Sequence, residues 1–443
     1  MTVEIYAIGG YNEIGKNMTA LKVGNEVVIL DMGLHLESYI RYTDSEDIVS
    51  LTAEELLKVG AIPNDKVIEK LRPLVKAIIP THAHLDHVGA LSFLSNKYNA
   101  PILCTPFTCE VIKAITTDEK IKLKNPIKVL NANSIYYISK NIKIEFINMT
   151  HSTPQTVMVA VHTPQGIILY ANDFKLDNNP IIGKKPNYAK LKEIGNKGVL
   201  GMIVDCTRAK DPVKTPSEAV AREMLRDVML GCDSRGHAVI VTTFSSHLAR
   251  LKSIVEFGKK MNRKIVFLGR SLAKYVGAAE KIGLVNFSKD VEIVKFGSKI
   301  KKRIRKLEKE RSKYIIVVTG HQGEPKATLS KMARKEIPFT FRPEDHIIFS
   351  CTIIPSSVNI ENREKLEDQL KTYGVRIFRN IHVSGHASKE DLRDLLNLIK
   401  PKHIIPAHGD SSMKKALADL AVEKGYTVGK TVHLIKDGSK LVI

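Results

Sequence analysis

The chain has 443 residues, of which 43% are hydrophobic and 26% are charged, a balance typical of globular proteins with a sizeable core. Lys and Arg number 68 against 47 Asp and Glu, so the formal charge is +21 and the chain is expected to attract polyanions. The sequence has no apolar run near the roughly 20 residues of a membrane-spanning helix, and its start lacks the basic and apolar regions of a secretory signal. The five cysteines are scattered without a Cys-x-x-Cys pair, so the composition favours a cytoplasmic protein over a membrane or secreted one.

Short β-branched segments bounded by Gly, Asn and Pro recur in the first part of the chain and predict strands. The predicted strands are Val3–Ile8, Met18–Val23, Val27–Leu30, Val75–Ile79, Ile142–Ile147, Val157–Val161 and Ile167–Tyr170. Residues 163–166, between the last two, predict the turn of an antiparallel hairpin. Helical patterns cover Ala53–Lys58, Asp65–Leu71 and Gly89–Lys97, so sheets with helices packed outside them indicate a layered α/β fold.

The pattern changes near residue 200, where strands and helices begin to alternate. This βαβ rhythm predicts a parallel sheet with crossover helices, in a second domain over residues 208–355. Residues 1–207 and 356–443 are expected to form the two parts of the other domain. The later part is predicted to hold a helix at Lys389–Ile399 and strands at His403–Pro406 and Val432–Ile435.

Residues 295–313 form the most basic stretch of the chain, with ten Lys or Arg residues against Glu308 and Glu310. As a helix, this stretch would carry positive charge on most of its faces. Two interpretations stay open: a solvated surface helix, or a strip that follows a phosphate backbone.

The strongest chemical signal lies at residues 81–87, which read Thr-His-Ala-His-Leu-Asp-His directly after a predicted strand. His82 and His84 are two residues apart in extended chain, so they point the same way and can bind one ion. Asp86 and His87, at the start of the next helix, can turn toward a second ion. Imidazoles and carboxylates are ligands that Zn²⁺ selects, so this loop predicts a dinuclear metal site.

Two ions need about six or seven protein ligands, so further ligands must come from other segments. His151, Asp173 and His408 each follow a predicted strand, and together they supply the missing ligands. Asp173 is suited to bridge both ions because a carboxylate has two oxygens. Asp31, after the strand that ends at Leu30, is expected to orient a metal ligand without binding the metal itself.

Taken in sequence order, Asp31, the His/Asp cluster at residues 82–87, His151, Asp173 and His408 resemble the motifs of the metallo-β-lactamase superfamily. The resemblance implies an α/β fold, the αβ/βα four-layer sandwich, with a dinuclear zinc site at one edge of the two sheets. Residues 208–355 are similar to the β-CASP domain, an α/β domain inserted in the members of the superfamily that process nucleic acids. That subfamily has an acidic residue after a strand and two later histidines, which Asp205, His386 and His408 match.

Four segments resemble the ribonuclease J family within this subfamily, and the archaeal type in particular. They are residues 9–18, 29–34, 319–325 and 384–388. Two positions depart from the family pattern: residue 321 is His where bacterial members commonly have Ser, and Cys206 stands where Asp-Ser-Thr is usual. Bacterial members also have a C-terminal extension, and the absence of one after His408 favours the compact archaeal type.

The resemblance implies a zinc-dependent 5′→3′ exoribonuclease that prefers 5′-monophosphate ends and releases 5′-mononucleotides, in RNA decay and maturation. Two Zn²⁺ are expected per subunit, with Mn²⁺ or Mg²⁺ as alternatives during turnover. One ion is assigned to His82, His84, His151 and Asp173. The other ion is assigned to Asp86, His87, Asp173 and His408.

The same resemblance implies roles for residues beyond the metal ligands. Asp86, Asp205 and His386 are the catalytic candidates, with His386 as the proton donor to the leaving group and Asp205 as the residue that orients it. A loop of small residues and hydroxyls is expected to bind the terminal 5′-phosphate of the RNA. Its residues are Ser384, Gly385, His386, Ala387 and Ser388.

Single-stranded RNA is the expected partner, bound by a homodimer that contacts RNA-processing, exosome-associated or ribosome-associated proteins, away from membranes. Two alternatives stay open: a β-CASP endoribonuclease in RNA processing, and a DNA nuclease of the same family. The charge of +21 and the inserted domain disfavour a thioesterase that acts on small molecules.

Overall fold

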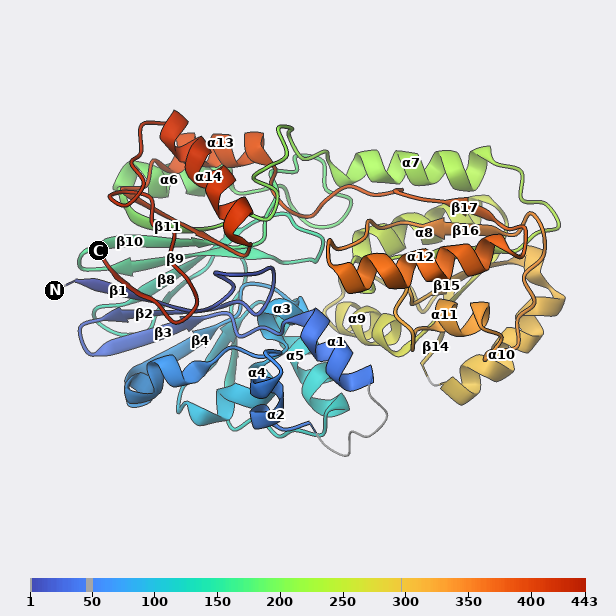
Figure 1. Cartoon of the computed structure of the whole chain (residues 1–443), viewed down its shortest axis with the longest axis horizontal. Coiled ribbons are helices and arrows are strands. Elements are labelled where there is room, and N and C mark those ends of the chain that lie inside the picture. Colours follow the sequence, from blue (N-terminus) through green and yellow to red (C-terminus); the bar gives the residue numbers. More distant parts are fainter. Residues whose placement is uncertain (1, 45–50, 296) are drawn as a thin grey trace. The chain divides into compact units, whose positions relative to one another are not determined.

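The computed structural model describes residues 2–44, 51–295 and 297–443, and the chain divides into two compact units (Figure 1). The first unit comprises residues 1–178, 183–215 and 384–443, and the second comprises residues 179–182 and 216–383. The chain rejoins the first unit at Ser384 rather than near residue 356, because α12 (Ser357–Lys371) and β17 (Arg376–Phe378) pack on the second unit's sheet. No helix among the described residues is long and apolar enough to cross a membrane.

The first unit contains a seven-stranded sheet of order β19-β1-β2-β3-β4-β5-β6. Its strands are β1 (Val3–Gly9), β2 (Met18–Val23), β3 (Glu26–Leu30), β4 (Val75–Ile79), β5 (Ile102–Cys104), β6 (Ile127–Val129) and β19 (Lys440–Val442). The first three strands pair antiparallel, whereas β3 to β6 pair parallel. The parallel strands therefore share one edge at which their carboxyl ends, and the loops that follow, lie together.

A six-stranded sheet of order β18-β11-β10-β9-β8-β7 completes the β structure of this unit. Its strands are β7 (Ile135–Tyr137), β8 (Lys143–Asn148), β9 (Val157–Thr163), β10 (Gly166–Ala171), β11 (Val199–Asp205) and β18 (His403–Ala407). Strands β9 and β10 form the predicted antiparallel hairpin, and β10, β11 and β18 pair parallel.

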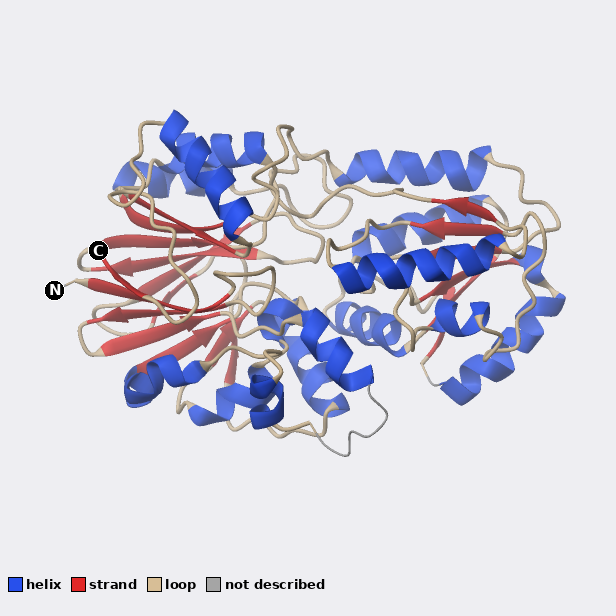
Figure 2. Cartoon of the chain, in the orientation of Figure 1, coloured by secondary structure: helices blue, strands red, loops and turns tan. Residues whose placement is uncertain are grey.

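The two sheets of the first unit face one another across a core of alternating strand residues. Ile5, Leu21 and Val28 from one sheet pack in a single buried cluster with Phe146 and Val159 from the other. Figure 2 shows helices on the outer side of each sheet, which gives the four layers expected from the sequence and confirms the fold class. The helices and 3₁₀ turns of this unit are α1 (Leu36–Asp44), α2 (Ala53–Lys58), η1 (Asp65–Leu74), α3 (Leu85–Val88), α4 (Leu91–Leu94), η2 (Ser95–Lys97), α5 (Pro106–Asp118), α6 (Tyr188–Lys197), α13 (Lys389–Ile399) and α14 (Ser411–Glu423).

The second unit is a six-stranded sheet of order β14-β13-β15-β12-β16-β17 in which every strand pair is parallel. Its other strands are β12 (Val239–Thr242), β13 (Lys264–Leu268), β14 (Val291–Val294), β15 (Tyr314–Val318) and β16 (His346–Phe349). Its other helices and 3₁₀ turn are α7 (Glu218–Gly231), α8 (Leu248–Lys260), α9 (Arg270–Lys281), α10 (Gly297–Lys309), η3 (Arg311–Lys313) and α11 (Thr328–Ala333). The βαβ rhythm thus produces the predicted parallel sheet with crossover helices.

The predicted strand at Val432–Ile435 is wrong. Within this segment only Val432 forms isolated bridges, with Ile404 and Val428, and the carbonyl of Ile435 accepts a hydrogen bond from the buried ammonium of Lys414. That bond takes the place of a strand partner, and the chain pairs again only at β19. The predicted helix over Gly89–Lys97 is shorter than expected and becomes α4 and η2, and the helix predicted over Asp65–Leu71 is the 3₁₀ segment η1.

Candidate metal centre

The predicted metal ligands meet at one edge of the first unit, where strands of both sheets end. His82 and His84 lie in the loop after β4, and Asp86 and His87 lie in α3 directly beyond it. The remaining ligands follow three strands of the other sheet: His151 after β8, Asp173 after β10 and His408 after β18. Their ligand atoms fall into two groups of four, each with all atoms within 4.8 Å of one another.

The first group consists of His82, His84, His151 and Asp173. Nδ1 of His84 lies 3.2 Å from Nε2 of His82 and 3.1 Å from Nε2 of His151. Oδ2 of Asp173 lies 3.5 Å from Nε2 of His82 and 3.4 Å from Nε2 of His151. Three imidazole nitrogens and one carboxylate oxygen therefore converge on a single point.

The second group consists of Asp86, His87, Asp173 and His408. Oδ1 of Asp173 lies 3.2 Å from Nε2 of His87 and 3.4 Å from Nε2 of His408. Oδ2 of Asp86 lies 3.6 Å and 3.7 Å from the same two nitrogens. Asp173 thus gives one carboxylate oxygen to each group, as expected for a bridging ligand.

The donor atoms in both groups fit metal ions in spacing and in chemistry. A tetrahedral Zn²⁺ with bonds of about 2.0–2.1 Å holds its ligand atoms roughly 3.3 Å apart, close to the separations in both groups. Oδ1 of Asp173 is buried and accepts no hydrogen bond from the described residues, although a buried carboxylate oxygen normally has a partner. A cation bound between these atoms would supply the missing partner.

Burial keeps several of these imidazoles neutral, which is the form that binds metal. It lowers the pKa of His82 and His151 well below the usual value, and the pKa of His84 to about 4. His87 is also buried, but the carboxylates of Asp173 and Asp31 outweigh burial and raise the pKa of His87 well above the usual value.

Hydrogen bonds to Nδ1 orient three of the imidazoles. Nδ1 of His87 donates to Oδ2 of Asp31 at 2.7 Å. Nδ1 of His151 donates to the carbonyl of Gly385 at 2.7 Å, and Nδ1 of His82 lies 3.0 Å from Oγ1 of Thr81. These contacts direct Nε2 of each ring toward the ligand groups, where Nε2 of His87 also lies 3.2 Å from Nδ2 of Asn17.

His408 is oriented by Asn17, a residue to which the sequence analysis assigned no role. Nδ1 of His408 lies 2.9 Å from Oδ1 and 2.8 Å from Nδ2 of Asn17, and Oδ1 also accepts from Nδ2 of Asn172 at 3.1 Å. Nδ2 of Asn17 donates to the carbonyl of Asp86 at 3.1 Å. With Nδ1 of His408 as a donor to Asn17, the Nε2 lone pair of His408 faces the second group.

Three residues of the site hold an uncommon backbone conformation. Asp31, Asp173 and His408 have φ values of 59°, 53° and 57°, in the left-handed region that non-glycine residues seldom adopt. His408 is held there because its N–H donates to the carbonyl of Gly10 at 2.6 Å and its carbonyl accepts from Thr207 at 2.8 Å. Backbone strain of this kind is typical of functional sites.

His386 and Asp205 lie together beside the first group. Nδ1 of His386 donates to Oδ2 of Asp205 at 2.7 Å, and its Nε2 lies 3.9 Å from Oδ2 of Asp173. Burial lowers the pKa of His386, but Asp205 and Asp173 outweigh burial and raise this pKa to about 9. The side chain stays 23% exposed, so the ring can reach a substrate while Asp205 fixes its orientation.

The loop Ser384–Ser388 lies against the metal ligands within the same unit. Gly385 packs so closely on His151 that a Cβ at this position would lie 2.9 Å from the imidazole ring. The N–H of Ser388 donates to Oγ1 of Thr215 at 2.9 Å, and Thr215 donates to the carbonyl of His386 at 2.8 Å. Thr215 therefore braces the loop. Thr215 stands in no motif, so this contact could not be predicted from the sequence.

Three family descriptions match the chain in sequence order. The metallo-β-lactamase superfamily matches residues 15–193 and the ribonuclease J β-CASP domain matches residues 236–368. The Zn-dependent metallo-hydrolase RNA specificity domain matches residues 374–433. Among solved structures, a protein of unknown function from Enterococcus faecalis V583 matches over 100% of both chains with a TM-score of 0.66, but at 16% identity it shows the fold alone.

Several curated relatives match the chain nearly end to end. Ribonuclease J of the archaeon Methanocaldococcus jannaschii is 46% identical over 100% of this chain and 99% of its own length. Ribonuclease J of Pyrococcus abyssi is 42% identical over 98% of this chain and 96% of its own length. Ribonuclease J 1 of Streptococcus pyogenes is 30% identical over 100% of this chain but only 74% of its own length.

The four-layer fold and its paired His/Asp groups define a metal-dependent hydrolase of the metallo-β-lactamase superfamily. The match to the ribonuclease J β-CASP domain and the relatives that align over nearly the whole chain identify the family within this superfamily. The chain belongs to the ribonuclease J family, a family of β-CASP nucleases, as the sequence motifs predicted.

Proposed function

We propose that the protein is a zinc-dependent 5′→3′ exoribonuclease that recognises a 5′-monophosphate end and releases mononucleotides. The observation that carries the proposal is the contact between the loop Ser384–Ser388 and the metal ligand His151, through the carbonyl of Gly385 at 2.7 Å. A terminal phosphate held on this loop would place a nearby phosphodiester at the metal centre. In this proposal the first unit is the metallo-β-lactamase domain and the second is the β-CASP domain.

The two groups of four ligand atoms would hold one Zn²⁺ each, with the carboxylate of Asp173 shared between them. When bound, such a pair of ions polarises the phosphate and lowers the pKa of a water toward roughly 7. The RNA specificity domain matched over residues 374–433 supports RNA as the substrate. The chain's own residues must then position the phosphate and move protons.

His386 would donate a proton from Nε2 to the leaving oxygen, since Nδ1 is held by Asp205 and the ring remains partly exposed. Asp86 is 16% exposed and is the more accessible carboxylate of the second group, so it would accept a proton from the attacking water. Ser384, Gly385 and Ala387 would bind the terminal phosphate through backbone N–H groups and the Ser384 hydroxyl. The N–H of Ser388 is held by Thr215, so Ser388 would contribute through its place in the loop.

RNA with a 5′-monophosphate is expected to be degraded at least about 10-fold faster than the same RNA with a 5′-hydroxyl, because charge-assisted hydrogen bonds to the phosphate are lost. The measurement is the rate of mononucleotide release from the two RNAs under single-turnover conditions. Ser384→Ala should reduce the difference, whereas Ser134→Ala, in the same unit, should preserve it. Equal rates on the two RNAs with the unaltered protein would contradict a 5′-phosphate site.

Asn17→Ala is expected to weaken metal binding about 10–100-fold, the usual effect of removing a residue that orients a ligand. The reason is that His408 would lose the acceptor that holds its Nδ1–H. Asn17→Asp keeps an oxygen at this position and should retain more metal. The measurement is metal content by mass spectrometry after dialysis against graded chelator.

Asn125→Ala is the matched control for Asn17. Its amide is also buried in the first unit and donates to the carbonyls of Tyr98 and Ala100, away from the metal ligands. Metal affinity in this variant should equal that of the unaltered protein. If Asn17→Ala bound both ions as tightly as Asn125→Ala, Asn17 would have no orienting role.

A further inference from the structure

Helix α10 has one apolar face, and that face is already covered. Ile300, Ile304 and Leu307 recur at helical spacing and lie in the buried core of the second unit. The rest of the helix is polar and exposed, except for Arg303 and Glu308, which are half-buried. Its exposed cations are Lys299, Lys301, Lys302, Arg305, Lys306 and Lys309.

Most of the positive charge on α10 has no local counterion. Arg303 pairs with Glu292 at 2.7 Å, and the nearby Lys313 pairs with Glu310 at 2.8 Å. The six exposed cations of α10 form no ion pair within the described parts of the chain. By contrast, in α12 of the same unit Lys371 pairs with Asp368 at 2.7 Å, as is usual for surface helices.

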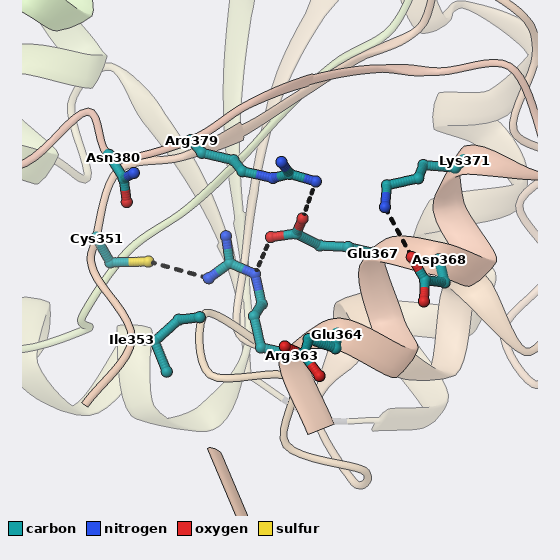
Figure 3. Close-up of a pocket in the computed structure, with 9 residues that line it drawn as sticks. All are labelled: Cys351, Ile353, Arg363, Glu364, Glu367, Asp368, Lys371, Arg379 and Asn380. Atoms are coloured by element: carbon teal, nitrogen blue, oxygen red, sulfur yellow. Dashed lines mark hydrogen bonds and ion pairs between the residues drawn. The ribbon is translucent and has the colours of Figure 1, made fainter. Parts of the chain in front are cut away.

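A cavity in the second unit lacks the excess of positive charge found on α10. This cavity of about 280 Å³ is lined by three cations and three carboxylates (Figure 3). Arg363 and Arg379 both pair with Glu367, and Lys371 pairs with Asp368. Because these charges compensate one another, an anionic ligand is attracted to α10 rather than to this cavity.

We propose that α10 binds the phosphate backbone of the RNA, and that this contact is separate from the catalytic residues. This inference rests on the proposed function in one respect, because it takes RNA as the ligand. A helix of 13 residues is about 20 Å long, enough to follow several phosphates. Lysines on flexible stems bind phosphates without reading bases, so this contact would not depend on sequence. An anionic membrane is disfavoured, because interfacial helices insert an apolar face and that of α10 is buried in the core.

The test compares two variants that remove the same number of charges. In the first variant, four lysines of α10 are changed to Gln: Lys299, Lys302, Lys306 and Lys309. In the control variant, four exposed lysines of the first unit are changed to Gln: Lys66, Lys70, Lys122 and Lys124. Binding of a cleavage-resistant 2′-O-methyl RNA of about 30 nucleotides is measured by fluorescence anisotropy over a range of salt, which counts the phosphates contacted.

The α10 variant should bind this RNA at least about 10-fold more weakly, and the slope of log K against log salt should fall by roughly 2–3. The control variant should change both quantities much less, and both variants should hydrolyse a trinucleotide at the unaltered rate. Equal slopes for the two variants would overturn the role of α10. If instead the α10 variant lost binding only to phosphatidylglycerol vesicles, the surface would bind membranes rather than RNA.

The outcomes distinguish an error in the RNA-binding role of α10 from an error in the proposed function. If the unaltered protein binds and hydrolyses RNA while the α10 variant keeps its salt slope, only the proposal for α10 is wrong. If the unaltered protein neither binds nor hydrolyses RNA, the proposed function is wrong as well.

Discussion

His386→Ala is expected to lower the rate of RNA hydrolysis about 10²–10⁴-fold, the contribution typical of a general acid, while both metal ions stay bound. Nε2 of His386 lies 3.9 Å from Oδ2 of Asp173, whereas the Nε2 atoms of four imidazoles of the two ligand groups lie 3.2–3.5 Å from an oxygen of Asp173. Loss of His386 should therefore remove a proton donor and leave the metal ligands in place. The measurements are single-turnover hydrolysis and metal content on the same preparation.

His162→Ala is the control for this variant, because His162 lies in the same unit on β9 and contacts Glu145 rather than the metal ligands. It should retain both metal and activity. Asp205→Asn should also lower the rate of hydrolysis, because Oδ2 of Asp205 accepts a hydrogen bond from Nδ1 of His386. Loss of a metal ion from His386→Ala would show that His386 is a ligand instead.

Asp173→Asn is expected to lose both metal ions and to reduce hydrolysis to background. Each oxygen of Asp173 faces a different group, so one substitution weakens both. The loss should exceed the 10–100-fold that is typical when only an orienting partner is removed. The measurement is metal content after dialysis, together with hydrolysis at added Zn²⁺.

Asp65→Asn provides a matched control, because Asp65 is a buried carboxylate of the same unit that pairs with Arg72 at 3.1 Å and Lys97 at 2.7 Å. This variant should lower stability without changing the number of bound ions. If Asp173→Asn kept one ion at full affinity, the bridging role of Asp173 would be wrong.

The candidate metal ligands can be proposed from the sequence because its strongest signal is local. Four potential ligands lie within residues 82–87, and the chemistry of such a cluster is visible without the fold. His151, Asp173 and His408 could be added because each follows a predicted strand, and strand ends are where distant segments meet. The structure does bring these residues into the two groups.

Other features of the site depend on contacts that no local pattern shows. Asn17 reaches His408 across 391 residues of sequence, and Thr215 reaches Ser388 across 173. A single Asn or Thr is common in turns, so nothing in its neighbourhood marks it as a partner of a metal ligand. Such contacts become visible only when strand order and register are known.

Parts of the fold could also be predicted from local sequence patterns, whereas other parts could not. The buried strand β4 was predicted at its observed bounds, since Val75, Ile78 and Ile79 give it the β-branched content typical of a strand. The edge strand β19 was missed because it has only three residues and is partly exposed. The return to the first unit at Ser384 was missed because only the packing of α12 assigns that helix to the second unit.

The most direct test of the proposed function is a time course on one RNA that carries a 5′-monophosphate with the label on that phosphate. Labelled mononucleotide should appear at the earliest times, without labelled intermediates, and Asp173→Asn should release none. Labelled oligonucleotides that appear first and shorten later would contradict it. The protein would then be an endonuclease, and Ser384–Ser388 would contact an internal phosphate instead of the 5′ end.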